Sequence, residues 1–292
     1  MNTNGPLLLN VGHAVHEADW NFNDISSPFT RIYYVTEGHA TVTIEDAVHV
    51  LRPEHMYIIP AFTRHTDACE GRFCHYYMHI YEEATAEDSL IGRYDFPFEI
   101  AGQPLDRTLF EALCEHNSSM ALKASDPRIY DNKTSLIDCV RLNRARPIWD
   151  RLESMGIIYQ LLGRFVREAT LKYDSTDPRI REAIKIIDAS SETPMVNELA
   201  HTVRMSADHF IRLFRKEVGC TPTQFVIDRK MTKAMLMLAS EPMMVKEVAY
   251  SLGYDNLSYF TRLFRRHTGV TPHAYRESFN VRADASPRVP PV

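Results

Sequence analysis

The stretch Phe210–Arg215, which reads FIRLFR, recurs 50 residues later as Phe260–Arg265, which reads FTRLFR. Gly219–Pro222 recurs at the same spacing as Gly269–Pro272, and both copies have the form Gly-x-Thr-Pro. A repeat of this length indicates that one supersecondary unit is present twice. The back half of the chain is therefore predicted to hold two related units in tandem.

Each unit has the pattern of a helix-turn-helix. Short helices are expected at Val196–Thr202 and Val245–Ser251, each followed by a turn and a longer helix. The expected capping residue of the longer helix is Ser206 in the first unit and Asp255 or Asn256 in the second. One matching unit alone would be compatible with an ordinary helical bundle that exposes a basic face, but two copies with the same apolar and basic positions favour the helix-turn-helix.

The longer helix of each unit should bury apolar residues at positions i, i+3 and i+4 and expose the opposite face. In helix-turn-helix proteins this second helix enters the major groove of DNA. Arg212 and Arg262 could each form two hydrogen bonds with a guanine edge, whereas the basic residues that follow them suit phosphates. The predicted DNA-binding residues are Asp208, Ile211, Arg212, Arg215 and Lys216 in the first unit, and Leu257, Ser258, Thr261, Arg262, Arg265 and Arg266 in the second.

Charge is distributed unevenly along the 292 residues, whose net charge is −5. Residues 1–177 hold 16 basic and 26 acidic residues, a net charge of −10, whereas residues 178–279 hold 15 and 11, a net charge of +4. The basic half is the half that carries the repeat. This asymmetry permits DNA binding there but does not prove it.

Composition limits the class of protein. Apolar residues make up 45% and charged residues 24%, as in a globular chain long enough for two domains. The apolar runs are shorter than the ~18 residues that a membrane span needs, and Met1–Asn10 has no basic residue of the kind that opens a secretory signal. The five cysteines are scattered and lack zinc-site spacing. We therefore expect a cytoplasmic protein that does not contact membranes.

Residues 178–279 resemble the DNA-binding domain of the AraC/XylS family of bacterial transcription regulators. The most specific part of the resemblance is Gly253–Arg276 in the second unit. The family implies a long helix between the units, here Thr223–Ala239, and two recognition helices in successive major grooves, ~34 Å apart. Asp208 departs from this pattern, since it is an acidic residue at the groove-facing start of the first recognition helix. At that position it could accept a hydrogen bond from cytosine or weaken contact with phosphates.

The first hundred residues alternate in a way that predicts strands. These are Arg31–Glu37, Ala40–Ile44, His49–Leu51, Met56–Ile59 and Phe73–Tyr81. With their turns they resemble the cupin-like barrel with which many members of the family bind an effector. The fold class is therefore expected to be α+β with two domains: an N-terminal cupin-like β-barrel with following helices, and a C-terminal all-α domain of two helix-turn-helix units.

The polar segment Asp174–Pro178 predicts the boundary between the domains, with Asp177 as a helix cap and Pro178 at the first helical position. We expect a sensor and dimerisation domain over residues 1–175 and a DNA-binding domain over 176–280. A flexible tail is expected over 281–292, which contains three prolines.

The resemblance to the family implies a small effector in the barrel, and an aromatic and polar lining would suit a sugar or similar polar metabolite. The expected effector-binding residues are Tyr33, Glu37, His65 and Tyr76. Strand alternation would put Tyr33 and Glu37 on one face of the first hairpin, but it does not say which face points inward. Aromatic residues in a barrel are more often core than ligand wall.

Histidines at 65, 75 and 79 raise the alternative of a cupin metalloenzyme fused to a DNA-binding module. The close ligand pair that such enzymes place on an early strand is missing, because the hairpin offers only Glu37 and His39. We therefore expect partly buried hydrogen-bonding histidines, with no metal, cofactor or catalytic residue, and no enzymatic activity. A third alternative is a front domain that only dimerises.

Asp150–Tyr173 has the longest helical pattern in the chain, with apolar residues at steps of three and four. In the family, helices after the barrel form dimer surfaces, but this helix could instead pack on its own barrel. The expected partners are double-stranded DNA, a small-molecule effector and a second copy of the chain, with RNA polymerase added if the protein is an activator.

Overall fold

The computed structural model describes residues 5–82, 90–131, 133–171, 177–190, 194–240 and 243–277. These divide into two units, of which the first contains residues 5–82 and 95–169 and the second contains 90–94 and 170–277 with the gaps just given. The first unit is rich in sheet and the second is helical, so the predicted two-domain α+β class is confirmed. The predicted boundary at 175/176 and the tail 281–292 lie outside the described residues.

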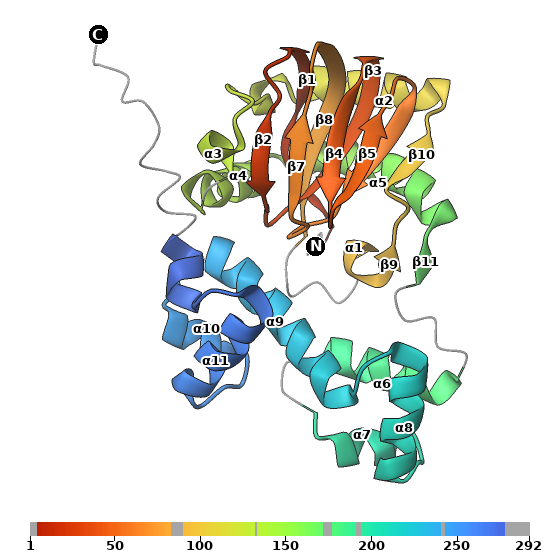
Figure 1. The fold of residues 1–292 in the computed structure, drawn as a ribbon, viewed down its shortest axis with the longest axis vertical. Helices are drawn as coiled ribbons and strands as arrows, with labels where there is room; N and C mark the ends of the chain where they lie inside the picture. The colour runs from red at the N-terminus through yellow and green to blue at the C-terminus, as the bar shows by residue number, and fades with distance from the viewer. Residues whose placement is uncertain are drawn as a thin grey trace. The chain divides into compact units, whose positions relative to one another are not determined.

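The first unit is built on two antiparallel sheets (Figure 1). The five-stranded sheet has the order β1-β8-β3-β6-β10, and the four-stranded sheet has the order β2-β7-β4-β5. The strands are β1 (Leu7–Glu17), β2 (Phe22–Ile25), β3 (Thr30–Gly38), β4 (Ala40–Ile44), β5 (Ala47–Leu51), β6 (His55–Ile59), β7 (His65–Ala68), β8 (Arg72–Tyr81) and β10 (Glu99–Ala101).

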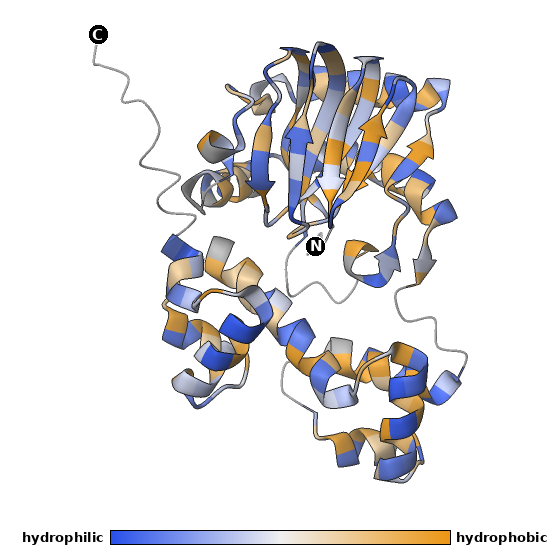
Figure 2. Ribbon diagram, in the orientation of Figure 1, coloured by the Kyte–Doolittle hydropathy of each residue, from blue (hydrophilic) through white to orange (hydrophobic). Residues whose placement is uncertain are grey.

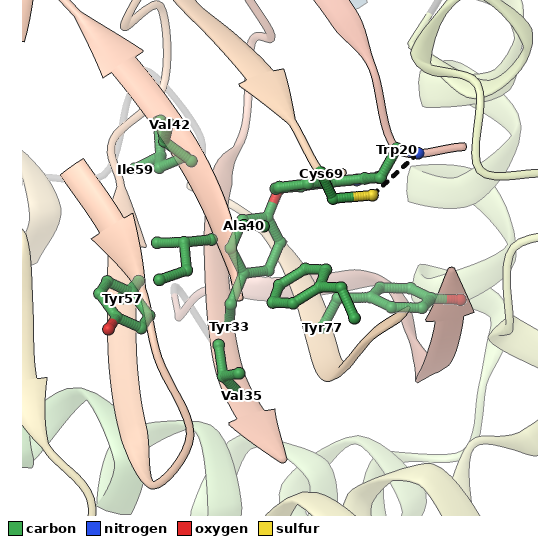
Figure 3. Close-up of a cluster of buried hydrophobic side chains, with 11 residues drawn as sticks. Trp20, Tyr33, Val35, Ala40, Val42, Tyr57, Ile59, Cys69 and Tyr77 are labelled. Atoms are coloured by element: carbon green, nitrogen blue, oxygen red, sulfur yellow. Dashed lines mark hydrogen bonds between the residues drawn. The ribbon is translucent and has the colours of Figure 1, made fainter. Parts of the chain in front are cut away.

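The predicted strands correspond to β3, β4, β5, β6 and β8. The eleven-residue strand β1 was not predicted, and it pairs with β8 along most of its length. Side chains from both sheets meet in one core between them, including Tyr33 from β3, Val42 from β4 and Ile59 from β6 (Figure 3). Alternation along each strand sends every second side chain into this core.

Helices follow the strands of the first unit and contact β1 and β3 of the larger sheet. They are α2 (Pro104–His116), the 3-10 helix η1 (Ser118–Met120), α3 (Pro127–Tyr130), α4 (Lys133–Ala145) and α5 (Ile148–Glu168). The predicted helix Asp150–Tyr173 extends too far, because Ala169 adopts extended backbone angles and Thr170–Leu171 forms the short strand β11.

The second unit consists mainly of six helices in its described part. They are α6 (Pro178–Ala189), α7 (Val196–Thr202), α8 (Ala207–Val218), α9 (Pro222–Ser240), α10 (Val245–Ser251) and α11 (Leu257–Thr268). Asp177 accepts a hydrogen bond from the Arg179 amide at 2.9 Å, and Pro178 is the first residue of α6, so this predicted cap is confirmed. Helix α1 (Leu90–Arg93) and the paired strands β9 (Tyr94–Asp95) and β11 lie where the chain passes between the units.

The helices of the second unit surround two separate apolar cores. The first half of α9 contributes Phe225 and Val226 to one core, and its second half contributes Met231 and Leu238 to the other. Figure 2 shows hydrophobic and hydrophilic residues side by side along these helices. None of the described helices is long and apolar enough to cross a membrane.

Candidate DNA-binding helices and barrel interior

The two helix-turn-helix units have the same turn geometry. In the first unit the Met205 amide donates to the Ala200 carbonyl at 2.8 Å, and in the second the Tyr254 amide donates to the Ala249 carbonyl at 2.9 Å. Helices α8 and α11 both end at a left-handed glycine, with φ of 85° at Gly219 and 82° at Gly269. The predicted short helices have the observed bounds of α7 and α10.

The apolar faces of α8 and α11 are equivalent. Phe214 packs edge-to-face on Phe225, with ring centroids 5.5 Å apart, and Phe264 packs in the same way on Tyr275 at 5.4 Å. These contacts fix the rotation of each helix about its axis. Of the predicted caps, the Asn256 side chain accepts a hydrogen bond from the Tyr259 amide at 3.0 Å, whereas Ser206 is at the N-cap without a side-chain hydrogen bond.

The predicted DNA-binding residues lie on the faces of α8 and α11 that do not enter the cores. Nine of the eleven are exposed, and the half-buried ones are Ile211 and Thr261. Within the described part of the chain, none of the side chains of Arg212, Arg215 or Arg265 forms an ion pair. Each helix therefore presents unneutralised guanidinium groups on its outer face.

The interior of the first unit is polar as well as aromatic. Tyr33 and His65 are buried, with 3% exposure each, and the Tyr33 ring lies 5.0 Å from that of His75 and 5.9 Å from that of Trp20. Figure 3 shows Tyr33 beside Trp20 and Cys69. Two of the four predicted effector-binding residues thus lie inside.

An arginine is buried in the same interior. Arg31, with 2% exposure, donates from Nη1 to Tyr130 Oη at 2.7 Å and to His79 Nε2 at 3.2 Å, and from Nη2 to Ser27 Oγ at 2.5 Å. Its ion-pair partner Asp131 is 3.4 Å away and equally buried. Sequence reasoning missed Arg31. The available signal was a charged residue at the start of a strand whose next residues are all apolar or aromatic.

Two family profiles match the chain, one on each unit. The profile of the AraC-like ligand binding domain matches residues 10–126, and a helix-turn-helix domain profile matches residues 199–278. The uncharacterized HTH-type transcriptional regulator YdiP of Escherichia coli K12 is 24% identical over 277 residues, which cover 92% of this chain and 82% of that protein. The chain is an AraC-family transcription regulator. Its first unit is the effector-binding domain of this family and its second unit is the DNA-binding domain.

Two further similarities are partial or distant. The regulatory protein PocR of Salmonella typhimurium is 31% identical over 105 residues, which cover 36% of this chain and 35% of that protein. Among solved structures, fatty acid-bound ToxT from Vibrio cholerae is 12% identical with a TM-score of 0.46, and the similarity covers 96% of this chain and 98% of ToxT.

In this AraC-family chain, Glu37 and Tyr76 do not face the interior, contrary to the expectation that they join Tyr33 and His65. The register between β3 and β8 shifts after Val35, which pairs with His75, so that Glu37 pairs with Cys74. This irregularity interrupts the alternation and places Glu37 outside, where its carboxylate binds Arg72 at 3.1 Å. Strand alternation alone could not reveal this shift.

Tyr76 lies on the face of β8 that packs against α2. Its ring stacks on Phe110 with centroids 6.0 Å apart, and its hydroxyl donates to Glu111 at 3.2 Å. The interior face of β8 instead carries His75, Tyr77 and His79. Alternation correctly separated Tyr76 from these residues, but the inward direction is set by the tertiary packing of α2.

The interior histidines are more deeply buried than expected, with 3% exposure for His65, 2% for His75 and 1% for His79. Burial lowers the pKa of His65 to about 4 and holds the pKa values of His75 and His79 well below the usual range. Burial also raises the pKa of Asp67 to about 7. In the described residues no group of three or more His, Cys, Asp or Glu side chains has the geometry of a metal site.

The interior contains polar atoms that have no hydrogen-bond partner among the described residues. They include His65 Nε2, Asp67 Oδ1, His75 Nδ1, His79 Nδ1 and Arg31 Nε. His65 and Asp67 approach within 3.8 Å, beyond hydrogen-bond distance. Leaving buried polar atoms unpaired costs about 1–3 kcal/mol for each group, so this set indicates a place where another polar molecule, water included, would be held.

Lys230 is a positioning residue in the DNA-binding domain that the sequence did not reveal. It is buried, and its Nζ donates to the Leu252 carbonyl at 2.5 Å and lies 5.3 Å from the Tyr254 ring centroid. Leu252 is the C-cap of α10. The lysine therefore ties α9 to the end of α10, where a cation also interacts favourably with the helix dipole.

Proposed function

We propose that this regulator reads DNA through the exposed faces of α8 and α11, with Arg212 and Arg262 at base edges. The main support is that each arginine lies on the helix face opposite two phenylalanines with 0% exposure. These are Phe210 and Phe214 in α8, and Phe260 and Phe264 in α11. Arg215, Lys216, Arg265 and Arg266 lie one turn further along, where phosphates would be met. Asp208, Ile211, Leu257, Ser258 and Thr261 complete the proposed contact surface.

The proposed domain limits are residues 1–175 for the effector domain, 176–280 for the DNA-binding domain and 281–292 for a tail. The protein acts in the cytoplasm and has no catalytic activity of its own. If it activates transcription, RNA polymerase is a further partner.

The proposed effector is a neutral polar molecule such as a sugar, bound in the barrel interior. Arg31 and Asp131 balance each other in charge there, and the lowered pKa values keep His75 and His79 neutral at pH 7. The unpartnered atoms are therefore mainly neutral donors and acceptors, which suit hydroxyl groups, and Trp20 offers a ring for a sugar face.

Titration with neutral sugars should change the fluorescence of Trp20, whereas the corresponding sugar acids should not. A Trp149→Phe background leaves Trp20 as the single tryptophan reporter. At a hundredfold excess over Kd, the ligand should raise the free energy of unfolding by about 2.7 kcal/mol. Replacing His75 with leucine should abolish the response. Silence across a broad panel of pentoses, hexoses and polyols would favour a domain that does not sense a sugar.

The proposed homodimer forms through an exposed seam on α5. Trp149, Gly156 and Gly163 are spaced by seven residues, and Leu152 and Tyr159 lie between them at heptad spacing. Trp149 is 61% exposed, Leu152 51% and Tyr159 40%. The opposite face of α5 packs on its own chain through Ile158, Leu161, Leu162 and Phe165.

The described residues of the chain make no close approach that would require glycine at Gly156 or Gly163. A Cβ atom at Gly156 or Gly163 would meet nothing within 4 Å, and glycine inside a helix costs about 1 kcal/mol relative to alanine. Both features are explained if the backbone of a second copy of α5 packs closely there. A second copy is favoured because the seam is apolar and repeats along its own length.

DNA selection from a random duplex library tests both the DNA-binding faces and the dimer. The wild-type chain should recover sites with two copies of a motif, and Trp149→Glu should sediment as a monomer and recover one copy. Val48→Glu changes a residue of 65% exposure on β5 and should behave as wild type. A monomeric wild type would contradict the seam, and failure to enrich any motif would contradict the DNA-binding faces.

A further inference from the structure

The turn before α8 places an arginine in a backbone conformation that favours glycine. Arg204 has φ of 57°, and the equivalent residue of the second unit is Gly253, with φ of 75°. The hydrogen bonds of the two turns match, because the Arg204 amide donates to the His201 carbonyl at 3.0 Å and the Gly253 amide donates to the Tyr250 carbonyl at 2.9 Å. The same turn is thus built with glycine in one unit and arginine in the other.

No interaction of the Arg204 side chain with the described residues offsets the cost of this backbone conformation. Residues other than glycine enter the left-handed region at a cost in free energy, because Cβ crowds the backbone. Arg204 is exposed, and its guanidinium group makes no hydrogen bond, ion pair or ring contact with the described residues. A residue in a disfavoured backbone conformation whose side chain has no such interaction with the described residues points to a partner outside the chain.

The position of Arg204 identifies the partner. It lies two residues before Ser206, the N-cap of α8, so it is adjacent to the end of the helix that meets the base edges in helix-turn-helix proteins. Phosphates border the groove at that end. The exposed face of α8 begins with Asp208, where α11 has Ser258, so the first unit carries an acidic group that repels the phosphates of DNA.

We infer that Arg204 contacts a DNA phosphate beside the groove entered by α8 and offsets the repulsion from Asp208. This rests on the proposed placement of α8 in the major groove. The contact carries no sequence information of its own, because phosphates are the same at every base pair. Its contribution is to hold the weaker of the two reading helices in register on the duplex.

The experiment compares Arg204→Gly, Arg204→Asn and Arg204→Lys in the full chain. Glycine and asparagine both tolerate the left-handed backbone but lack the charge, whereas lysine keeps it. The probes are a duplex selected by the wild-type chain and a mixed-sequence duplex of the same length. Binding is measured from 50 to 200 mM salt, and the melting temperature of each variant is measured in parallel.

Arg204→Gly and Arg204→Asn should bind both duplexes about three- to tenfold more weakly at 50 mM salt, as expected for one lost phosphate contact. The slope of log K against log salt should become shallower by about 0.9, which reduces the wild-type advantage about threefold by 200 mM salt. Melting temperatures should stay equal or rise, because the strained residue is gone. Arg204→Lys should retain most of the affinity.

If the glycine and asparagine variants keep the affinity and the salt slope of the wild type, the inference about Arg204 is wrong. The proposed role of the exposed faces of α8 and α11 in DNA binding would not be affected by that result. The same holds if DNA binding is unchanged but transcription from a reporter falls, which would assign Arg204 to a protein partner. A lower melting temperature that accounts for the lost binding would also overturn it. A wild-type chain that binds neither duplex would remove the placement of α8 and this contact together.

Discussion

Replacing Arg262 with alanine should weaken binding to the selected duplex by ~5–150-fold and remove discrimination at one base pair, which corresponds to about 1–3 kcal/mol for a lost bidentate contact. Arg262 is exposed on α11, and its guanidinium carbon lies 5.8 Å from the Tyr259 ring centroid. The Tyr259 ring thus lies near the guanidinium group and leaves its positive charge unneutralised. The loss is measured by titrating single-base variants of the selected duplex.

Arg212→Ala and Arg266→Ala provide matched controls for Arg262→Ala. Arg212 is the equivalent residue of α8, and its effect should be smaller because Asp208 shares its exposed face. Arg266 is exposed one turn further along α11, and its loss should weaken binding equally on all duplexes. If Arg262→Ala also weakens all duplexes equally, Arg262 binds a phosphate and the base assignment is wrong.

Lowering the pH from 6.5 to 5.5 should destabilise the effector domain by about 2 kcal/mol through four of its buried groups. His65, His75 and His79 all have lowered pKa values in the folded state, so the unfolded chain takes up protons first as the pH falls below 6.5. Each of the three removes about 1 kcal/mol of stability over this interval, because the unfolded histidine is only half protonated at pH 6.5. Their stabilising contribution is complete above pH 6.5 and declines towards the folded pKa.

Asp67 acts in the opposite direction over the same interval. Its pKa of about 7 in the folded state lies above the unfolded value of 3.8, so the folded chain holds the proton that the unfolded chain releases. This returns about 1 kcal/mol as the pH falls from 6.5 to 5.5, so the three histidines and Asp67 together give a net loss of about 2 kcal/mol. The contribution of these four groups to stability is therefore expected to rise with pH to about 7 and to change little above it.

Urea unfolding followed by tryptophan fluorescence measures this dependence on the effector domain alone, because Trp20 and Trp149 are the two tryptophans of the chain. His75→Gln should reduce the loss of stability between pH 6.5 and 5.5 by about 1 kcal/mol. Stability that is constant or increases from pH 6.5 to 5.5 would show that the interior histidines are already charged or solvated.

Both helix-turn-helix units could be predicted from the sequence because they are defined by local periodicity. Phenylalanines at i and i+4 fix which face of α8 and α11 is buried, and the remaining face follows from helix geometry. The repeat supplied an internal check, since each apolar position occurs twice. The outward direction of Arg212 and Arg262 needed no knowledge of distant residues.

The barrel interior depended on contacts between residues far apart in the sequence. The bulge after Val35 arises from pairing with β8, and it places Glu37 outside although alternation put it beside Tyr33. Tyr76 faces outward because Phe110 of α2 packs against it, some 34 residues away. Arg31 tolerates burial because Asp131, a hundred residues on, pairs with it.

The sequence by itself thus determined two tandem helix-turn-helix units and five of the strands that precede them, because the spacing of apolar residues indicates both the element and the face that it can bury. Only the tertiary structure decided which side of β3 and β8 is the interior, which polar groups remain unpartnered there and which face of α5 is exposed. The physical reason is that register shifts, ion pairs and helix docking join residues that no local pattern links.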